Sequence, residues 1–301
     1  MPDVTDAEVF QANRDLMFAV AYRMLGTATD AEDAVQDAWL RWSAEPRGDV
    51  ASPRAYLSRI VANTSLNRLR SARARREAYV GPWLPEPLLT EAGPDAAERA
   101  ELAESVSVAM LVVLESLTPD ERAVFVLREV FGFSYAEIGA TLGRSDAAVR
   151  QLAHRAREHV QARRPRFEVD WDQQREVTER FLAAAAGGDI SGLMTVLAPD
   201  VTLLTDGGGK ARAALRPING AGKVARFLVA IAGRPYMGVE VADMSLAAAE
   251  INGALGTLIM AGSRPIAALT LTVSSGRVTA IQLLANPDKL TALAAGRTLP
   301  L

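Results

Sequence analysis

Residues 133–157 constrain this chain more than any other segment, because they have the spacing of two helices joined by a tight turn. Ile138 and Leu142 lie one helical turn apart, and Val149 follows where it can complete a small shared core. Gly143 predicts the end of the first helix, since glycine readily takes the positive φ that is favoured just after a helix. The segment therefore predicts a helix, a turn and a second helix.

The second helix of this pair is rich in arginine. Ser145 or Asp146 can cap it by accepting a hydrogen bond from its first free N–H groups. Arg150, His154 and Arg157 then recur at helical spacing on a face that does not need burial. This pattern predicts a helix-turn-helix whose second helix enters the major groove of DNA. The alternative is an ordinary pair of helices with a solvated arginine face.

The distribution of charge favours contact with nucleic acid, although the formal net charge is −3. Residues 54–76 contain seven arginines and no acid, and residues 144–166 contain seven arginines and two acids. Acids gather elsewhere, notably at Asp30, Glu32, Asp33 and Asp37. Because salt screens charges beyond about 10 Å, the local field rather than the net charge decides the attraction of phosphate. Two separate stretches are therefore expected to attract a polyanion.

Composition excludes several kinds of site. The 301 residues, 49% hydrophobic and 23% charged, are typical of a globular protein with about two domains. There is no cysteine, and both histidines, His154 and His159, lie on the arginine-rich helix, so we expect no disulfide, metal site, cofactor or catalytic residue. No apolar run reaches membrane length and the first residues are acidic, so we expect a cytoplasmic protein without a signal peptide or membrane contact.

The first half of the chain predicts helices, because apolar residues recur at helical spacing. Ser52-Pro53 and Thr118-Pro119 are helix starts, since proline suits a first helical turn and serine or threonine caps it. The expected helical segments before the helix-turn-helix are 10–42 with a break at 26–30, 54–76, 97–117 and 118–131.

The later part of the chain changes character. Residues 81–88, Gly-Pro-Trp-Leu-Pro-Glu-Pro-Leu, cannot form a helix because prolines fix φ and lack a donor, so we expect a linker. Residues 173–197 predict two helices split at Gly187-Gly188-Asp189, and residues 221–232 predict one more. The expected strands are 201–205, 210–215, 270–273 and 277–281, with turns at 206–209 and 274–276. The predicted fold class is multidomain: two all-α modules and then an α+β domain.

Several motifs together resemble a known family. Asp30-Ala31-Glu32-Asp33-Ala34-Val35-Gln36-Asp37, residues 63–70 and residues 133–157 resemble bacterial sigma factors of the extracytoplasmic-function (ECF) group. Residues 170–295 resemble a SnoaL-like domain of the NTF2-like cone fold, at Phe181, residues 197–201, Ile218-Asn219-Gly220 and Asn286-Pro287-Asp288-Lys289-Leu290. The combination, with residues 83–88 and 206–210, is similar to the SigJ-type sigma factors. It implies sigma region two at 1–78, a linker at 79–96, region four at 97–166 and a regulatory SnoaL-like domain at 167–301.

The resemblance implies roles for the first two helical stretches. The acidic helix would bind core RNA polymerase through Asp30, Asp33, Gln36 and Asp37. The basic helix would bind the minus-ten promoter element, with arginines on phosphates and asparagines at base edges. The residues implied are Arg59, Asn63, Asn67, Arg68, Arg70, Arg73 and Arg76. A pocket for an unstacked base would lie near residues 41–52.

The helix-turn-helix would read the minus-thirty-five element. The residues implied are Arg144, Ser145, Ala148, Arg150, Gln151, His154, Arg155 and Arg157. The sequence departs from the family pattern at two positions: Ala148 stands where threonine is common, and Leu152 where arginine is common. We therefore expect one phosphate contact of the family to be missing here.

For the C-terminal domain, the resemblance implies regulation in cis. The linker would dock on two elements of the domain, residues 206–210 and 286–289. The residues implied are Trp83, Leu84, Pro85, Asp206, Gly208, Lys210, Asn286, Pro287, Asp288 and Lys289. Two alternatives stay open: Trp83 packs on its own helical module, and residues 207–209 form a flexible hairpin tip. A small ligand in the cone stays open as well.

The expected function is that of an alternative sigma factor that binds core RNA polymerase and promoter DNA, and not that of an enzyme. Nothing pairs the candidate acids of the cone by spacing; they are Asp200, Asp206, Glu240, Asp243 and Glu250. One alternative is a ligand-sensing one-component helix-turn-helix regulator. Another is a SnoaL-like enzyme fused to a DNA-binding module. Whether the C-terminal domain activates or inhibits is not fixed by the sequence.

Overall fold

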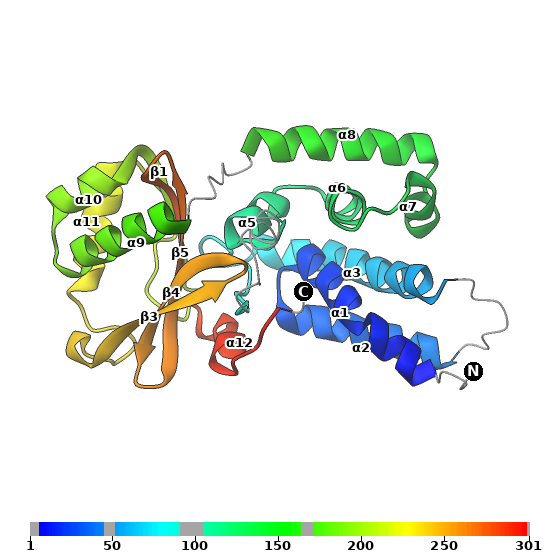
Figure 1. Cartoon of the computed structure of the whole chain (residues 1–301), viewed down its shortest axis with the longest axis horizontal. Helices are drawn as coiled ribbons and strands as arrows, with labels where there is room; N and C mark the ends of the chain where they lie inside the picture. Colours follow the sequence, from blue (N-terminus) through cyan, green and yellow to red (C-terminus); the bar gives the residue numbers. More distant parts are fainter. Residues whose placement is uncertain (1–5, 45–51, 91–104, 164–170, 300–301) are drawn as a thin grey trace. The chain divides into compact units, whose positions relative to one another are not determined.

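The computed structural model describes residues 6–44, 52–90, 105–163 and 171–299, and for residues 72–77 the backbone alone (Figure 1). Contacts divide the chain into two compact units. The first comprises Met1–Glu77, Leu111–Arg164 and Leu299–Leu301, and the second comprises Ala78–Met110 and Pro165–Thr298. The described part of the expected linker, residues 79–90, therefore belongs to the same unit as the C-terminal fold.

The helical half of the chain agrees with the expected pattern. Its elements are α1 (Asp6–Leu25), α2 (Ala28–Ala44), α3 (Pro53–Glu77), α5 (Val108–Glu115), α6 (Pro119–Phe125), the π-helix η1 (Val126–Val130), α7 (Tyr135–Leu142) and α8 (Asp146–Arg163). The helix expected from residue 97 begins among residues that lie outside the described ones. In the first unit, Met17, Val20 and Tyr22 of α1 are fully buried, and Leu57 and Val61 of α3 are buried as well.

Local capping chemistry fixes the helix ends, as the sequence predicts. Thr118 accepts from the N–H of Glu121, whose side chain in turn accepts from the N–H of Thr118, and Ser134 and Glu137 repeat this capping box. Gly143 ends α7 in the left-handed conformation, with φ 63° and ψ 38°. Ser145 rather than Asp146 caps α8, because its hydroxyl accepts from the N–H of Ala148.

The second unit is a mixed sheet with helices on one face (Figure 1). Its elements are α9 (Trp171–Ala186), α10 (Ile190–Val196), β1 (Leu197–Asp206), β2 (Ile218–Asn219), α11 (Ala221–Ala232), η2 (Val241–Asp243), β3 (Met244–Ile251), β4 (Ala254–Ala261), β5 (Arg264–Ser274), β6 (Arg277–Leu284), η3 (Pro287–Lys289) and α12 (Thr291–Ala294). The strand order is β2-β1-β6-β5-β4-β3, in which β1 pairs with β6 in parallel and the other pairs are antiparallel.

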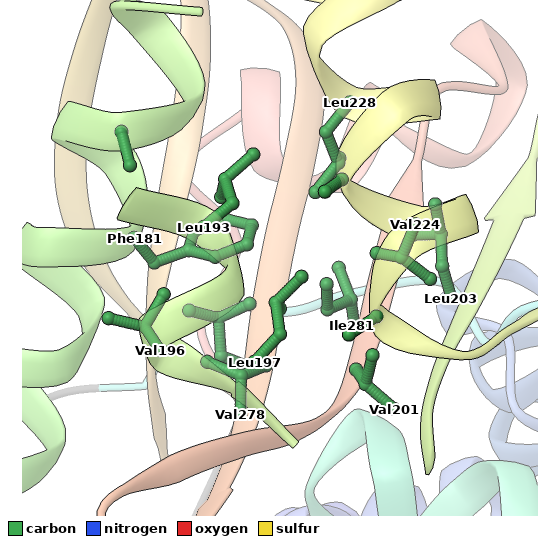
Figure 2. Close-up of a cluster of buried hydrophobic side chains, with 14 of the residues drawn as sticks. Phe181, Leu193, Val196, Leu197, Val201, Leu203, Val224, Leu228, Val278 and Ile281 are labelled. Atoms are coloured by element: carbon green, nitrogen blue, oxygen red, sulfur yellow. The ribbon is translucent and has the colours of Figure 1, made fainter. Parts of the chain in front are cut away.

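Hydrophobic side chains fill the space between this sheet and its helices (Figure 2). Phe181, Leu193 and Leu228 contribute from the helices, and Leu203 and Ile281 contribute from the strands; all are at least nine-tenths buried. The sheet therefore closes on α9, α10 and α11 by hydrophobic burial, as an α+β cone requires.

One expected strand does not form, and the sheet contains strands that the sequence did not predict. Residues 210–215 form no strand, because the hydroxyl of Thr205 takes up both backbone groups of Ala214, at 2.7 and 3.2 Å, in place of a ladder partner. Strands β3 and β4 were not expected, and Asn252-Gly253 forms the tight turn between them, with φ of 53° and 70°. Leu142 is half-buried rather than part of the core, which Ile138 and Val149 form.

Among the residues that the structure describes, no helix has the length and apolar character needed to cross a membrane.

Candidate functional site

The arginine-rich face of α8 is exposed, as the sequence predicts. Arg150, Gln151, His154 and Arg155 all point away from the core. Leu152 is only 8% exposed, so it faces inward, at a position where arginine would be buried. The departure at this position therefore replaces a basic side chain with one that packs, and the exposed face of α8 keeps its arginines on either side.

One tyrosine, which the sequence reasoning did not single out, orders three arginines around the helix-turn-helix. The guanidinium of Arg128 lies 4.7 Å from the centre of the Tyr135 ring, and that of Arg150 lies 5.6 Å from it. Arg157 donates to the Tyr135 hydroxyl at 3.2 Å and lies 3.5 Å from the Glu129 carboxylate. Two of the expected minus-thirty-five residues are thus held in place by contacts within the module.

The basic helix α3 presents most of its expected DNA residues outward. Arg59, Asn67 and Arg70 are exposed and Asn63 is half-buried, whereas the side chains of Arg73 and Arg76 lie outside the described residues. The loop near residues 41–52, expected to hold an unstacked base, lies largely outside them as well.

Arg68 differs from the other arginines of α3, because it contacts the acidic helix. Its guanidinium donates to Asp37 at 2.8 Å and to Asp33 at 3.1 Å. The hydrogen bond to Asp37 contributes most to raising the pKa of Arg68, against the opposing effect of partial burial. The structure therefore joins an expected DNA residue to two residues expected to bind polymerase.

The remaining acidic-helix residues divide into two kinds. Asp30 accepts from the Thr27 hydroxyl at 2.7 Å, and its own N–H donates to that hydroxyl, so it belongs to the start of α2. Gln36 is exposed and leaves the outer face of α2 open for contact.

Asp120 joins the two expected DNA-reading modules inside the first unit. It accepts from Arg70 of α3 at 2.8 Å and from Arg144, next to α8, at 3.0 Å. Burial would raise the pKa of Asp120, but the hydrogen bonds and charges of Arg70 and Arg144 outweigh it and lower this pKa. A groove of about 530 Å³ surrounds the carboxylate and is also lined by Gln151 and Arg155. The two surfaces expected to read DNA therefore share one carboxylate, which the sequence reasoning missed.

A second contact inside the first unit is buried. Arg122 of α6 is 1% exposed, donates to the backbone oxygen of Arg23 in α1 at 3.0 Å and pairs with Glu115. Burial lowers the pKa of Arg23 itself to about 10. This arrangement fixes α6 to α1 through a buried charged group.

The start of the linker docks in the second unit as the motif predicts. Asp206, fully buried, accepts from the Tyr79 hydroxyl at 2.6 Å and from the N–H of Leu84 at 2.8 Å. The ammonium of Lys289 donates to Asp206 at 2.7 Å and to the Leu84 carbonyl at 2.6 Å. The same ammonium lies 4.0 Å from the centre of the Trp83 ring. Burial, reinforced by the Asp206 carboxylate, raises the pKa of Tyr79, which keeps its hydroxyl a donor.

Close packing explains the glycine at residue 208. Gly208 has φ +57°, and a Cβ there would collide with the side chains of Asn286 and Tyr79, which are themselves joined by a 2.8 Å hydrogen bond. Only glycine fits this approach without displacing the dock. Pro85, which follows Leu84 in the linker, is buried, and Lys210 pairs with Asp288 where both side chains are more than half exposed.

The end of the linker has a second dock, which the sequence reasoning missed. Asn252 is fully buried; its side chain accepts from the N–H of Leu88 at 2.9 Å and donates to the carbonyl of Val106 at 3.0 Å. The N–H of Thr90 donates to Glu250 and its hydroxyl accepts from Gly253, each at 3.0 Å. An Asn-Gly pair such as Asn252-Gly253 predicts a hairpin turn, but nothing in the sequence indicates that this turn contacts the linker.

The described residues hold no cluster of histidine, cysteine, aspartate or glutamate suited to a metal ion. Asp200, Glu240 and Asp243 are exposed and Glu250 is half-buried, while Asp206 is used by the linker. None of these candidate acids belongs to the apolar core between the sheet and its helices.

Two models of known protein families match the helical half of the chain. The family model described as Sigma-70 region 2 matches residues 9–75, and the model described as Sigma-70, region 4 matches residues 107–160. The first covers α1 to α3, and the second covers the helix-turn-helix and the helices before it.

Relatives cover nearly the whole chain. It is 43% identical over 293 residues to the ECF RNA polymerase sigma factor SigJ of Mycobacterium tuberculosis, covering 94% of this chain and 92% of that one. It is 32% identical to the probable ECF RNA polymerase sigma factor SigI of the same species, covering 95% of each. The crystal structure of M. tuberculosis SigJ superposes with a TM-score of 0.72 and 39% identity, covering 94% of this chain and 97% of that one. The chain therefore belongs to the ECF RNA polymerase sigma factors.

Proposed function

We propose that this sigma factor binds core RNA polymerase through α2, reads the minus-ten element with α3 and the minus-thirty-five element with α8, and is controlled in cis by its own C-terminal unit. The observation that carries the control is the burial of the linker in that unit, where Asp206 and Lys289 hold Leu84 from both sides. A linker held this way restrains the module that follows it.

The acidic and basic faces support the assignment of partners. Gln36 and Asp33 are exposed on α2, and Arg59, Asn67 and Arg70 are exposed on α3. Arginine offers a planar fork suited to phosphate and guanine, and asparagine offers both donor and acceptor to a base edge. The protein partner is assigned to α2 and the DNA partner to α3, and Arg68 joins the two surfaces through Asp33 and Asp37.

The test is transcription in vitro from a library of genomic fragments, with core polymerase alone or with the full chain. We expect start sites that appear only with the chain, and retention of core polymerase by the immobilised chain. Binding of the same duplex by the chain without polymerase, as a dimer on paired half-sites, would support the one-component regulator instead. Absence of both core binding and new start sites contradicts the proposal.

The salt dependence of promoter binding tests the DNA surface. Arg70→Ala and Arg144→Ala should each reduce the slope of log affinity against log salt by about 1, because each removes a cation that displaces counterions from phosphate. The measurement is holoenzyme binding to a labelled promoter at several salt concentrations. Arg180→Ala removes an exposed arginine from α9 and should leave the slope unchanged. An unchanged slope in the first two variants contradicts the phosphate contacts.

Removing the carboxylate shared by the two modules should raise the affinity for promoter DNA. Asp120→Asn should raise the affinity for a promoter with both elements by up to about tenfold at low salt, since each half-exposed ion pair contributes roughly 0–1 kcal/mol to the closed arrangement. The gain should shrink as salt screens the pairs. Glu158→Gln removes an acid from α8 that contacts neither arginine and serves as the control. Equal gains in both variants would mean that charge alone, not the shared contact, is responsible.

We propose that the C-terminal unit is regulatory and not catalytic. The apolar filling between sheet and helices and the exposure of Asp200, Glu240 and Asp243 support this role. The cone leaves its acids on the outside or in the linker dock, which is unsuited to acid–base chemistry on an enclosed substrate.

A further inference from the structure

We propose that Asn252 is a positioning residue that limits how far the two promoter-reading modules can separate, because its one side chain holds Leu88 of the linker and Val106 at the start of region four. The inference rests on the proposed function. It goes beyond the dock at Asp206 because Asn252 lies on another turn and holds another part of the linker.

The clamp consists of two-sided contacts at a single buried amide. The carbonyl of the Asn252 side chain accepts from Leu88 N–H at 2.9 Å, and its NH₂ group donates to the Val106 carbonyl at 3.0 Å. The backbone N–H of Asn252 also donates to the Leu88 carbonyl at 2.9 Å. Asparagine suits this position, because it tolerates φ +53° and its amide is a donor on one side and an acceptor on the other.

The contacts around the clamp make it part of the sheet edge. Leu89 bridges to Ile251 of β3 on one side and to Thr298 on the other. The Thr90 hydroxyl accepts a hydrogen bond from the N–H of Gly253, and Leu88 is fully buried. Linker residues 88–90 thus pair with the end of β3 through an isolated bridge and its neighbouring hydrogen bonds, which gives them backbone partners that a free linker would lack.

The length of chain between the two clamped ends gives the contact its consequence. Eighteen peptide units separate residues 88 and 106, so without the clamp only the chain length limits their separation, to at most about 60 Å. One amide holds their backbone groups within about 8 Å of each other, the sum of two hydrogen bonds and the width of the amide. The minus-ten and minus-thirty-five elements are separate sites on the duplex, so binding both at once requires the modules that read them to separate. The clamp therefore removes reach that promoter binding uses.

Loosening the clamp should raise the affinity of the holoenzyme for a promoter that requires both elements to be bound at once. Asn252→Gly keeps the positive φ of the turn and removes both side-chain hydrogen bonds, so we expect holoenzyme to bind a two-element promoter about tenfold more tightly. A promoter fragment that carries only the minus-ten element needs no separation of the modules, and its affinity should not change. Thr90→Val removes the hydroxyl that Gly253 uses, at nearly constant volume, and should act in the same direction with a smaller gain.

The control uses the matching turn elsewhere in the sheet. Ser275 takes φ +51° before Gly276 between β5 and β6, so Ser275→Gly likewise places glycine at a positive-φ turn position, in a turn other than the one that holds Leu88 and Val106, and both affinities should stay at the wild-type value. Equal or weaker binding of the two-element promoter by Asn252→Gly, or an equal gain on the minus-ten fragment, overturns the clamp. Failure of the proposed function is separate, because the wild-type holoenzyme would then bind neither fragment.

Discussion

Asp206→Asn should lower the free energy of unfolding of the second unit by about 3–5 kcal/mol, because it leaves the ammonium of Lys289 buried without the carboxylate that offsets its charge. The side chain of Lys289 is 9% exposed and that of Asp206 is fully buried. Asparagine keeps the shape of the side chain and an acceptor for Leu84, so the loss measures the charge rather than the packing. Urea unfolding followed by tryptophan fluorescence reports it, since Trp83 and Trp171 of this unit contribute to the signal beside Trp39 and Trp42 of the first unit.

A second lysine–aspartate pair in the same unit supplies the control. Lys210 and Asp288 are more than half exposed, so Asp288→Asn should cost no more than about 1 kcal/mol. If Asp206→Asn does not fold, the double variant with Lys289→Met should recover stability, because it removes both buried charges together. Equal losses in Asp206→Asn and Asp288→Asn would contradict a special role for the buried pair.

Arg122→Met should destabilise the first unit by a similar amount, about 3–5 kcal/mol, because it breaks a buried ion pair and leaves the Arg23 carbonyl without this donor. Methionine replaces the aliphatic stem of the Arg122 side chain, so the cavity that remains is small. Unfolding in urea followed by far-ultraviolet circular dichroism, which is dominated here by helix, measures the loss.

The control is an arginine–glutamate ion pair of the same unit, in which the arginine side chain is exposed. Arg155 lies 3.3 Å from Glu121 and its side chain is 63% exposed, so Arg155→Met should change stability by no more than about 1 kcal/mol. Adding Glu115→Gln to Arg122→Met should recover part of the loss, since the carboxylate no longer lacks its partner. A single loss that the second change does not relieve would place the effect in packing rather than in charge.

Local chemistry made the helices and their ends predictable. Thr118 and Gly143 act through groups three to five residues away, so a short window of sequence contains the whole interaction. The hairpin at Ser275-Gly276 was predictable for the same reason, as was the break between α9 and α10. The expected strand at 210–215 does not form because the Thr205 hydroxyl accepts from the N–H of Ala214. The alternation of side chains along the sequence does not predict such a hydrogen-bond partner.

The docking of the linker was predictable only in part. Its first dock was expected from a resemblance that joins residues 83–88, 206–210 and 286–289, and the structure brings these together at Asp206. The second dock at Asn252 and the shared carboxylate at Asp120 carry no comparable signal. An asparagine before glycine predicts a turn, and an aspartate in a first helical turn predicts a helix start, and both features are satisfied locally without a distant partner.

The sequence by itself determined the helical modules, their caps, the helix-turn-helix, the clustering of arginines on two helices and the family to which these belong. Only the tertiary structure decided which distant groups share those charges. Tyr79 and Asp206 are 127 residues apart and Arg70 and Asp120 are 50 apart, and such pairs form only after the folds that carry them close. Capping and periodicity act within one or two turns of the chain, whereas these contacts depend on how whole elements pack.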